Sequence, residues 1–136
     1  MYEFFDHTAD LGLRVRASNL NDLFADAAAA LFAAIVDGRD SVRHEREVDL
    51  EIVGTDREYL LFDWLRELLY RFEVDHLLLS KLQVEVGDAG LKAKAWGEPI
   101  DPKRHVLSHE VKAITYHGLK VEHVGEEWIA EVIVDI

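Results

Sequence analysis

The amino-acid sequence predicts an α+β fold in which two amphipathic helices pack on an antiparallel or mixed β-sheet. Residues 20–36, and the segment from Thr55 to about Phe72, space their apolar residues by three and four positions, as one face of a helix requires. From Leu77 onward the apolar spacing changes to two, which is typical of strands. Strand–helix units followed by consecutive strands favour the α+β class.

The composition indicates a single domain over residues 1–136. Apolar residues make up 49% and charged residues 31% of the chain, a balance typical of soluble globular proteins. The chain has no cysteine, which excludes disulfides, thiolate nucleophiles and cysteine-based zinc sites. No apolar run approaches the roughly 18 residues that span a bilayer, and the start lacks the basic region of a signal peptide. We therefore expect a cytoplasmic protein without a membrane partner.

The chain is strongly acidic, with 27 acidic and 15 basic residues and a net charge of -12. Tight binding to a phosphate backbone depends on Lys and Arg, so direct binding of nucleic acid is not expected to be the main activity. An acidic surface suits a basic protein partner or a bound cation. The composition also leaves open that the charge only keeps the protein soluble.

The first half of the chain predicts two strands before the first helix. Residues 2–5 and 11–15 are the expected strands, and Ser18-Asn19 offers the helix N-cap. The glycine of Asp37-Gly38 is expected to end that helix as a left-handed cap.

A third strand and the second helix are expected in the middle of the chain. Residues 48–52 alternate between apolar and acidic side chains, and Thr55 and Glu58 have the spacing of a capping box. The apolar surface of the helix that follows is wide, so we expect it to be buried on more than one side.

The second half of the chain predicts consecutive strands. The two prolines of residues 98–102 predict a loop, because proline lacks a ladder donor. Both faces of the last strand carry large apolar residues, which favours a central position in the sheet. The expected strands are residues 82–86, 91–95, 111–116, 119–124 and 127–136.

Polar side chains gather at both ends of the chain. Asp6, His7, Thr8 and Asp10 precede the second expected strand, where they form either a turn or a site. Asp135 ends the last strand, and a terminal carboxylate at Ile136 would add a second negative charge. A partly desolvated carboxylate must neutralise, pair or bind a cation.

A sheet could bring Asp10, Asp135 and the terminal carboxylate together. Such an all-oxygen site would suit a hard cation such as Ca²⁺ or Mg²⁺. A solvated chain end is the alternative.

Two further polar clusters have alternative interpretations. His105 and His109 are four residues apart, as in a helical two-histidine site, but no Glu follows the first of them and the region favours an exposed strand edge. Asp63 and Glu67 form ordinary surface pairs on the second helix or line a groove. The chain has no phosphate-binding glycine-rich loop and no nucleophile elbow.

Four stretches together resemble one protein family, and they follow one another in the order that the family has. They are His7-Thr8-Ala9-Asp10-Leu11-Gly12-Leu13, Tyr59-Leu60-Leu61-Phe62-Asp63-Trp64-Leu65, Glu110-Val111-Lys112-Ala113-Ile114-Thr115-Tyr116-His117-Gly118-Leu119 and Val132-Ile133-Val134-Asp135-Ile136. The matches span nearly the whole chain, from residue 4 to 136, and through them the chain resembles the archease family. Leu11 and Leu13 stand where isoleucine is common, and the step Ser108-His109 departs from the family pattern, so His109 is assigned no role.

The resemblance implies a non-catalytic protein that activates an RtcB-type RNA ligase. Archeases promote guanylylation of that ligase with GTP, and its multiple turnover, in tRNA splicing and RNA repair. The ligase is then the partner, and contact with RNA is indirect. The alternatives are a chaperone-like modulator of RNA-modifying enzymes, such as a tRNA methyltransferase, and a metal-dependent hydrolase.

Carried over residue by residue, the metal site of the family falls on Asp10, Asp135 and Ile136. Ile136 would contribute a main-chain or terminal oxygen. The resemblance implies calcium, with magnesium or manganese as alternatives. Asp6 and His7 are expected to support the site or to form the turn, and Thr8 to bond to the backbone.

Overall fold

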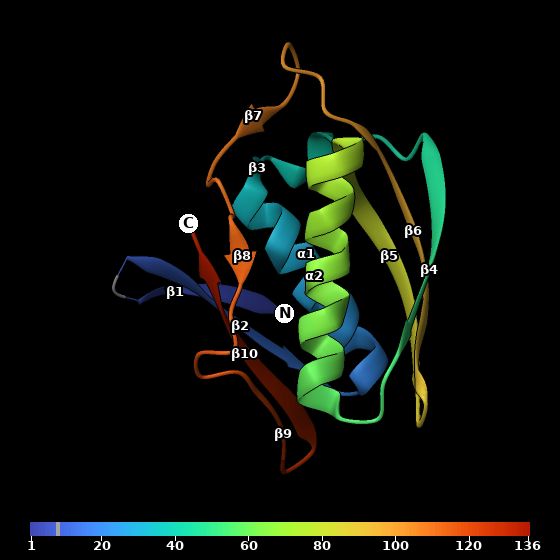
Figure 1. The fold of residues 1–136 in the computed structure, drawn as a ribbon, viewed down its shortest axis with the longest axis vertical. Helices are drawn as coiled ribbons and strands as arrows, with labels where there is room; N and C mark the ends of the chain where they lie inside the picture. Colours follow the sequence, from blue (N-terminus) through green and yellow to red (C-terminus); the bar gives the residue numbers. More distant parts are fainter. Residues whose placement is uncertain (8) are drawn as a thin grey trace.

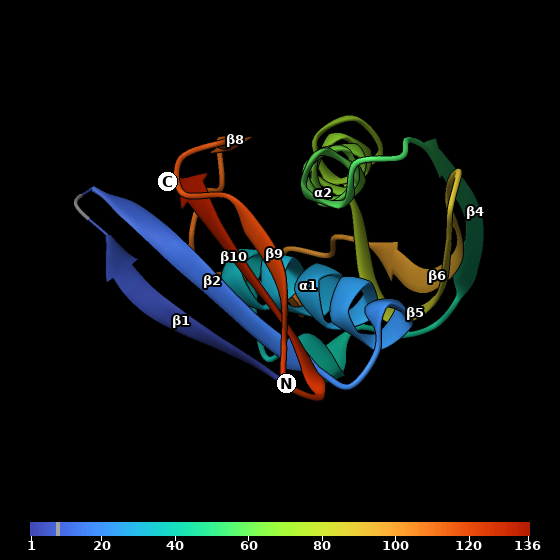
Figure 2. The ribbon, with the colours of Figure 1, turned by 90° about the horizontal axis from the view of Figure 1, so that it is seen from below.

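The computed structural model describes residues 1–7 and 9–136 and confirms the α+β class. Two helices, α1 (Leu20–Ile35) and α2 (Arg57–Asp75), lie between a five-stranded and a three-stranded sheet (Figures 1 and 2). The apolar faces of both sheets and both helices share one hydrophobic core. No helix within the described residues is long and apolar enough to cross a membrane.

The five-stranded sheet joins the two ends of the chain. The order is β1-β2-β10-β8, with β9 also pairing with β10, and every pair is antiparallel. The last strand is therefore central, as its two apolar faces predict. The strands are β1 (Tyr2–His7), β2 (Asp10–Ala17), β8 (Ala113–Ile114), β9 (Lys120–Val124) and β10 (Glu127–Asp135).

The three-stranded sheet has the order β4-β6-β5 and is also antiparallel. A separate two-residue pair joins β3 to β7 near the end of α1. These strands are β3 (Val36–Asp37), β4 (Arg46–Val53), β5 (Leu77–Gly87), β6 (Gly90–Pro99) and β7 (Val106–Leu107).

Helix α1 begins as expected but ends differently. Asn19 is the N-cap, and its side chain accepts a hydrogen bond from the Asp22 amide at 2.8 Å. The prediction that Gly38 caps the C-terminus is wrong, because Val36 is already extended and enters β3. Gly38, with φ of +67°, instead opens the 3₁₀ helix Arg39–Ser41.

The N-cap of α2 is Asp56 rather than Thr55. The Asp56 carboxylate accepts hydrogen bonds from the amides of Glu58 and Tyr59, each at 3.0 Å, so the predicted capping box does not form. The expected wide burial of this helix is confirmed by Trp64, which is fully buried. Its indole nitrogen donates to the Phe24 carbonyl of α1 at 3.0 Å, which ties the two helices together.

Two expectations for the second half of the chain need correction. Strand β6 continues to Pro99, which pairs opposite Leu77. The loop therefore begins two residues later in the chain than predicted. Proline is tolerated there because it ends the strand and needs no ladder donor. The β-rich stretch 111–116 contributes only the two residues of β8.

Gly97 is expected to be the least replaceable glycine of the three-stranded sheet. A Cβ atom at this position would lie 1.7 Å from the Leu78 carbonyl oxygen, which is backbone and cannot turn aside. Gly97→Ala should therefore lower the free energy of unfolding by about 3 kcal/mol, measured by urea denaturation. Gly87→Ala is the control, since its Cβ would meet nothing closer than 3.9 Å. Equal stability of the two variants would contradict this account.

Candidate functional site

The candidate site lies where β2 begins and β10 ends. Asp10 is the first residue of β2 and Asp135 the last of β10, and the register sets them directly opposite each other. Directly opposed residues of an antiparallel pair project from the same face, with Cβ atoms about 5 Å apart. Both residues are half-buried, and Ile136 follows at once. The structure thus brings together the three residues that the sequence predicts.

The end of β10 is held from its other side as well. Asp135 lies opposite Ala113 of β8, and its carbonyl oxygen accepts a hydrogen bond from the Lys112 amide at 2.7 Å. The Ile136 side chain is half-buried against the core. These contacts fix the backbone on which the Asp135 carboxylate and the oxygens of Ile136 are placed.

His7 extends the site across the hairpin between β1 and β2. It lies opposite Asp10, and its Nδ1 atom is 3.4 Å from Asp10 Oδ2. Nδ1 is buried and has no hydrogen-bond partner among residues 1–7 and 9–136. The His117 ring contacts the His7 ring edge-to-face at 5.5 Å between centroids. Two imidazoles therefore lie beside the carboxylate pair.

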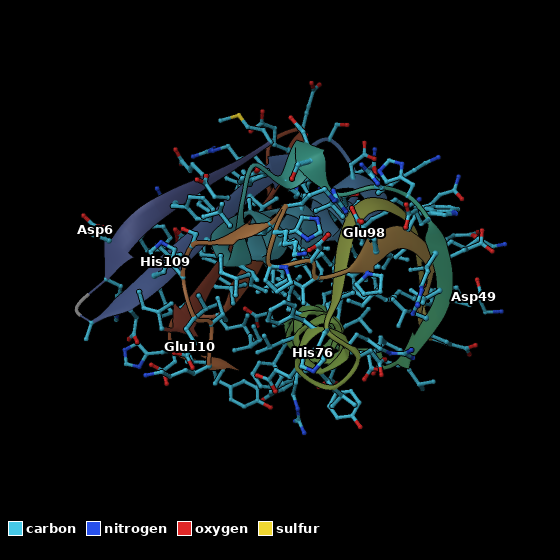
Figure 3. All side chains as sticks on the ribbon, turned by 90° about the horizontal axis from the view of Figure 1, so that it is seen from above. Asp6, Asp49, His76, Glu98, His109 and Glu110 are labelled. Atoms are coloured by element: carbon cyan, nitrogen blue, oxygen red, sulfur yellow. The ribbon has the colours of Figure 1, made fainter. Side chains whose placement is uncertain are left out.

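Asp6 lies elsewhere on the hairpin. It is opposite Leu11, on the other face of the strands, and is exposed at the margin of the molecule (Figure 3). The geometry therefore places His7, and not Asp6, beside Asp10. The turn role expected for Thr8 lies outside the described residues.

A charged cluster secures the register that sets Asp10 opposite Asp135. Arg14 of β2 contacts Glu131 of β10 at 2.8 Å, and its guanidinium lies 4.6 Å from the centroid of the Phe5 ring. Burial raises the pKa of Glu131, but hydrogen bonds from Arg14 and Lys120 outweigh it and hold that pKa below its ordinary value. No local sequence pattern indicates this cluster, because only the strand register assembles it.

The donors available for a cation are mainly oxygens. Within residues 1–7 and 9–136, no three His, Asp or Glu side chains form a group able to hold a metal. A cation at this position would therefore need the oxygens of Ile136 in addition to the carboxylates of Asp10 and Asp135. Such a donor set fits a hard cation such as Ca²⁺ or Mg²⁺, which prefers oxygen ligands.

The second histidine cluster is structural. His105 is buried, although the sequence favours an exposed strand edge, because a polar network satisfies both of its nitrogens. Nδ1 accepts from the Asp101 amide at 2.8 Å, and Nε2 lies 3.3 Å from Glu98 Oε2. His109 (Figure 3) is exposed, whereas His105 is buried, so the two histidines form no shared site.

Glu98 is the centre of that network and was not identified from the sequence. Only 3% of it is exposed, yet it accepts hydrogen bonds from the Arg43 amide and the Arg104 guanidinium. Burial raises the pKa of Glu98, and these two donors together with His105 outweigh that effect, so the pKa lies below its ordinary value. Its partners are distant in the sequence, so no local motif indicates it.

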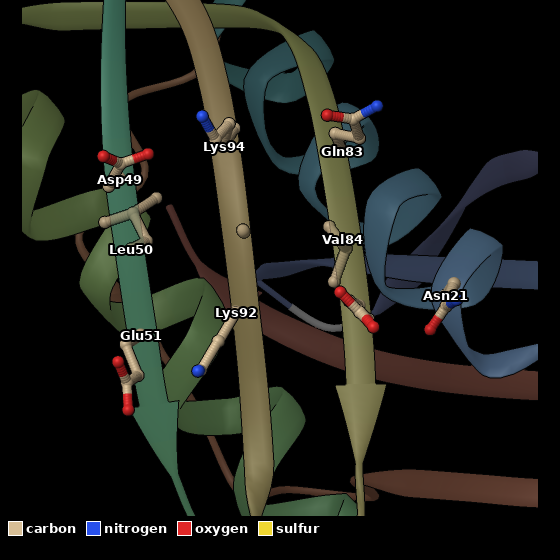
Figure 4. Close-up of a pocket in the computed structure, with 10 residues that line it drawn as sticks. Asn21, Asp49, Leu50, Glu51, Gln83, Val84, Lys92 and Lys94 are labelled. Carbon is tan, nitrogen blue, oxygen red and sulfur yellow. The ribbon is translucent and has the colours of Figure 1, made fainter.

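A broad hollow on the three-stranded sheet offers no comparable chemistry. Its charged side chains lie across neighbouring strands, with Asp49 opposite Lys94 and Glu51 opposite Lys92 (Figure 4). Opposite charges alternate there, as on an ordinary solvated sheet face. On α2, Glu67 forms the expected surface pair, with Arg71 at 3.1 Å.

The chain combines a small α+β fold with a carboxylate pair where its first hairpin meets its last strand. A family model described as the archease protein family matches residues 2–136, and the chain belongs to that family. It is 45% identical to a protein archease of Methanopyrus kandleri over 139 residues, covering 99% of each chain. It is 39% identical to the corresponding protein of Pyrococcus furiosus over 140 residues, covering 99% of this chain and 98% of that protein.

Two solved structures share the fold. The solution structure of protein 1598 from Methanobacterium thermoautotrophicum is 35% identical, with a TM-score of 0.85 and coverage of 99% of this chain and 98% of that chain. The crystal structure of an archease from Thermotoga maritima, described as a possible chaperone, is 19% identical, with a TM-score of 0.67 and coverage of 100% and 98%. At that identity the second comparison supports the fold alone.

Proposed function

We propose that this protein is a non-catalytic, metal-binding cofactor that activates an RtcB-type RNA ligase. It promotes GTP-dependent guanylylation of the ligase and its multiple turnover in tRNA splicing and RNA repair. Membership of the archease family supports this role. The observation that carries it is the placement of Asp10 opposite Asp135, one residue before Ile136.

Charge complementarity supports a protein partner of this kind. A ligase active site that holds RNA and GTP must be basic, and this chain carries a net charge of -12. The end of the sheet that bears the carboxylate pair is then the part that docks. The same charge disfavours direct binding of RNA, so contact with RNA is indirect.

The residues of the site have distinct roles in this proposal. Asp10, Asp135 and the oxygens of Ile136 hold a divalent cation, calcium in the first instance and magnesium or manganese as alternatives. A cation bound there offsets phosphate charge during guanylylation. His7 lies 3.4 Å from the Asp10 carboxylate and supports the site from the neighbouring strand. Arg14 and Glu131 maintain the strand register.

A guanylylation assay tests the proposed activation. Purified ligase is incubated with radiolabelled GTP and divalent metal, with and without this protein, and the covalent ligase–GMP adduct is counted over time. We expect the protein to raise the initial rate roughly tenfold or more, which corresponds to about 1.4 kcal/mol of barrier. An unchanged rate and an unchanged number of turnovers would contradict the proposal.

A chaperone-like modulator of RNA-modifying enzymes is the second candidate. The Thermotoga maritima relative is described as a possible chaperone. A protein with this role would slow the aggregation of a tRNA methyltransferase on heating and leave ligase guanylylation unchanged. Hydrolysis of phosphoesters by the protein and a divalent metal alone would instead favour a metal-dependent hydrolase.

A further inference from the structure

An exposed cluster of aromatic rings lies near the candidate site, and we call it the aromatic ledge. It consists of Tyr59 and Phe62 of α2 and Tyr116 of the turn after β8. The Tyr116 ring stacks on Phe62 at 3.9 Å between centroids and contacts Tyr59 edge-to-face at 5.7 Å. Phe62 is buried, but 58% of Tyr59 and 56% of Tyr116 remain exposed. The two exposed tyrosine rings, in contact with each other, form an aromatic surface that a partner can contact.

The backbone holds Tyr116 in place before any partner binds. The Thr115 hydroxyl donates to the Ile133 carbonyl at 2.9 Å and accepts from the His117 amide at 3.2 Å. The Leu119 amide donates a hydrogen bond to the Tyr116 carbonyl at 3.2 Å, which closes the turn. A ring held this way loses little conformational freedom on binding, which favours affinity.

The same turn connects the aromatic ledge to the carboxylate pair. His117 follows Tyr116 directly and contacts His7, which lies beside Asp10. A partner that covers Asp10 and Asp135 therefore has the aromatic ledge within reach of the same surface.

An exposed carboxylate lies beside the aromatic ledge. Asp63 lies one helical turn after Tyr59 and is exposed, and no ion pair within the described part of the chain includes it. Residues four apart on a helix are neighbours on its surface. Aromatic faces beside a carboxylate match a guanidinium group, which stacks on rings and pairs with carboxylates. A nucleotide would bring its phosphates close to Asp63 and to the carboxylate pair.

We propose that the aromatic ledge is a second docking contact for the basic protein partner, and that it receives an arginine side chain of that partner. This inference rests on the proposed function, since it takes an RtcB-type ligase as the partner. The carboxylate pair acts on the cation, whereas the aromatic ledge contributes affinity without a cation. The two contacts can therefore be separated experimentally.

Tyr70 provides a matched control on the same helix. It is 55% exposed, almost the same fraction as Tyr59. It lies eleven residues further along α2, roughly 16 Å away at 1.5 Å per residue.

Binding of the full-length protein to immobilised ligase in EDTA tests this inference. We expect Tyr116→Ala and Asp63→Asn each to raise the dissociation constant roughly tenfold, and Tyr116→Phe and Tyr70→Ala to leave it unchanged. Circular dichroism melting confirms that each variant is folded.

The outcomes distinguish the two proposals. An unchanged dissociation constant for Tyr116→Ala would overturn the aromatic ledge as a docking contact and leave the proposed function standing. Weaker binding of Tyr116→Ala, with no stimulation by the wild-type protein, would support the aromatic ledge and overturn the proposed function. A wild-type protein that binds no ligase in EDTA and none with divalent metal present would overturn both. Shifts of the tyrosine resonances on titration with GMP, with an unchanged dissociation constant, would indicate a nucleotide site instead.

Discussion

Asp10→Asn is expected to abolish stimulation of an RtcB-type ligase while leaving the fold intact. The substitution keeps the shape of the side chain but removes one of the two opposed carboxylates. Asp10 is half-buried at the end of a strand, so the substitution should change the free energy of unfolding little. We expect the number of turnovers per ligase, measured with excess RNA and GTP, to fall by roughly tenfold or more, to the level without the protein.

Asp6→Asn is the matched control for this prediction. It removes the same charge from the same hairpin, four residues earlier, but Asp6 lies opposite Leu11 on the other face. We expect the Asp6→Asn protein to stimulate the ligase fully. Full stimulation by a folded Asp10→Asn protein would rule out the carboxylate pair as the site of activation.

A large effect on stability is expected from removing the Glu98 carboxylate. Glu98→Ala leaves the buried His105, the Arg104 guanidinium and the Arg43 amide without their shared acceptor. Removing one member of a buried charged network typically costs 3–5 kcal/mol. Since Arg104 is partly exposed and can regain water, we expect a loss of about 3 kcal/mol in urea unfolding at pH 7. Glu45→Ala, which breaks only an exposed pair with Arg43, should change the stability by less than about 0.5 kcal/mol.

The same carboxylate should make the stability depend on pH. The pKa of Glu98 is lower in the folded chain than its ordinary value, because hydrogen bonds outweigh the effect of burial. Its stabilising contribution is therefore complete above the unfolded pKa, about 4.3. The contribution is lost as the pH falls through the folded pKa. Between pH 7 and 3 the Glu98→Ala protein should lose less unfolding free energy than the wild type, and equal losses would contradict this.

Local patterns in the sequence predict much of the fold. The helical spacing of α1 and α2 and the period-two strands are set by which residues must be buried, so they are visible without coordinates. The central place of β10 follows from large apolar residues such as Ile129 and Val132 on its opposite faces. Details of the helix ends were not predictable, because Thr55 and Asp56 both offer N-caps and only the backbone decides between them.

The carboxylate pair was predictable only in part. The sequence places Asp10 and Asp135 each at the end of a predicted strand. Their proximity, however, depends on the register of two strands from opposite ends of the chain. Contacts among distant residues carry no local signal. The Glu98 network and the stacking of Tyr116 on Phe62 are of this kind, and the structure was needed to find them.

Calorimetric titration of the metal-free protein with calcium chloride tests whether Asp10 and Asp135 hold a divalent cation. We expect one Ca²⁺ ion to bind per chain, Asp10→Asn and Asp135→Asn each to abolish this binding, and Asp6→Asn to leave it unchanged. If the wild-type protein bound neither calcium nor magnesium nor manganese, the proposed cation site would be contradicted. Binding that survives in both the Asp10→Asn and the Asp135→Asn protein would contradict it as well.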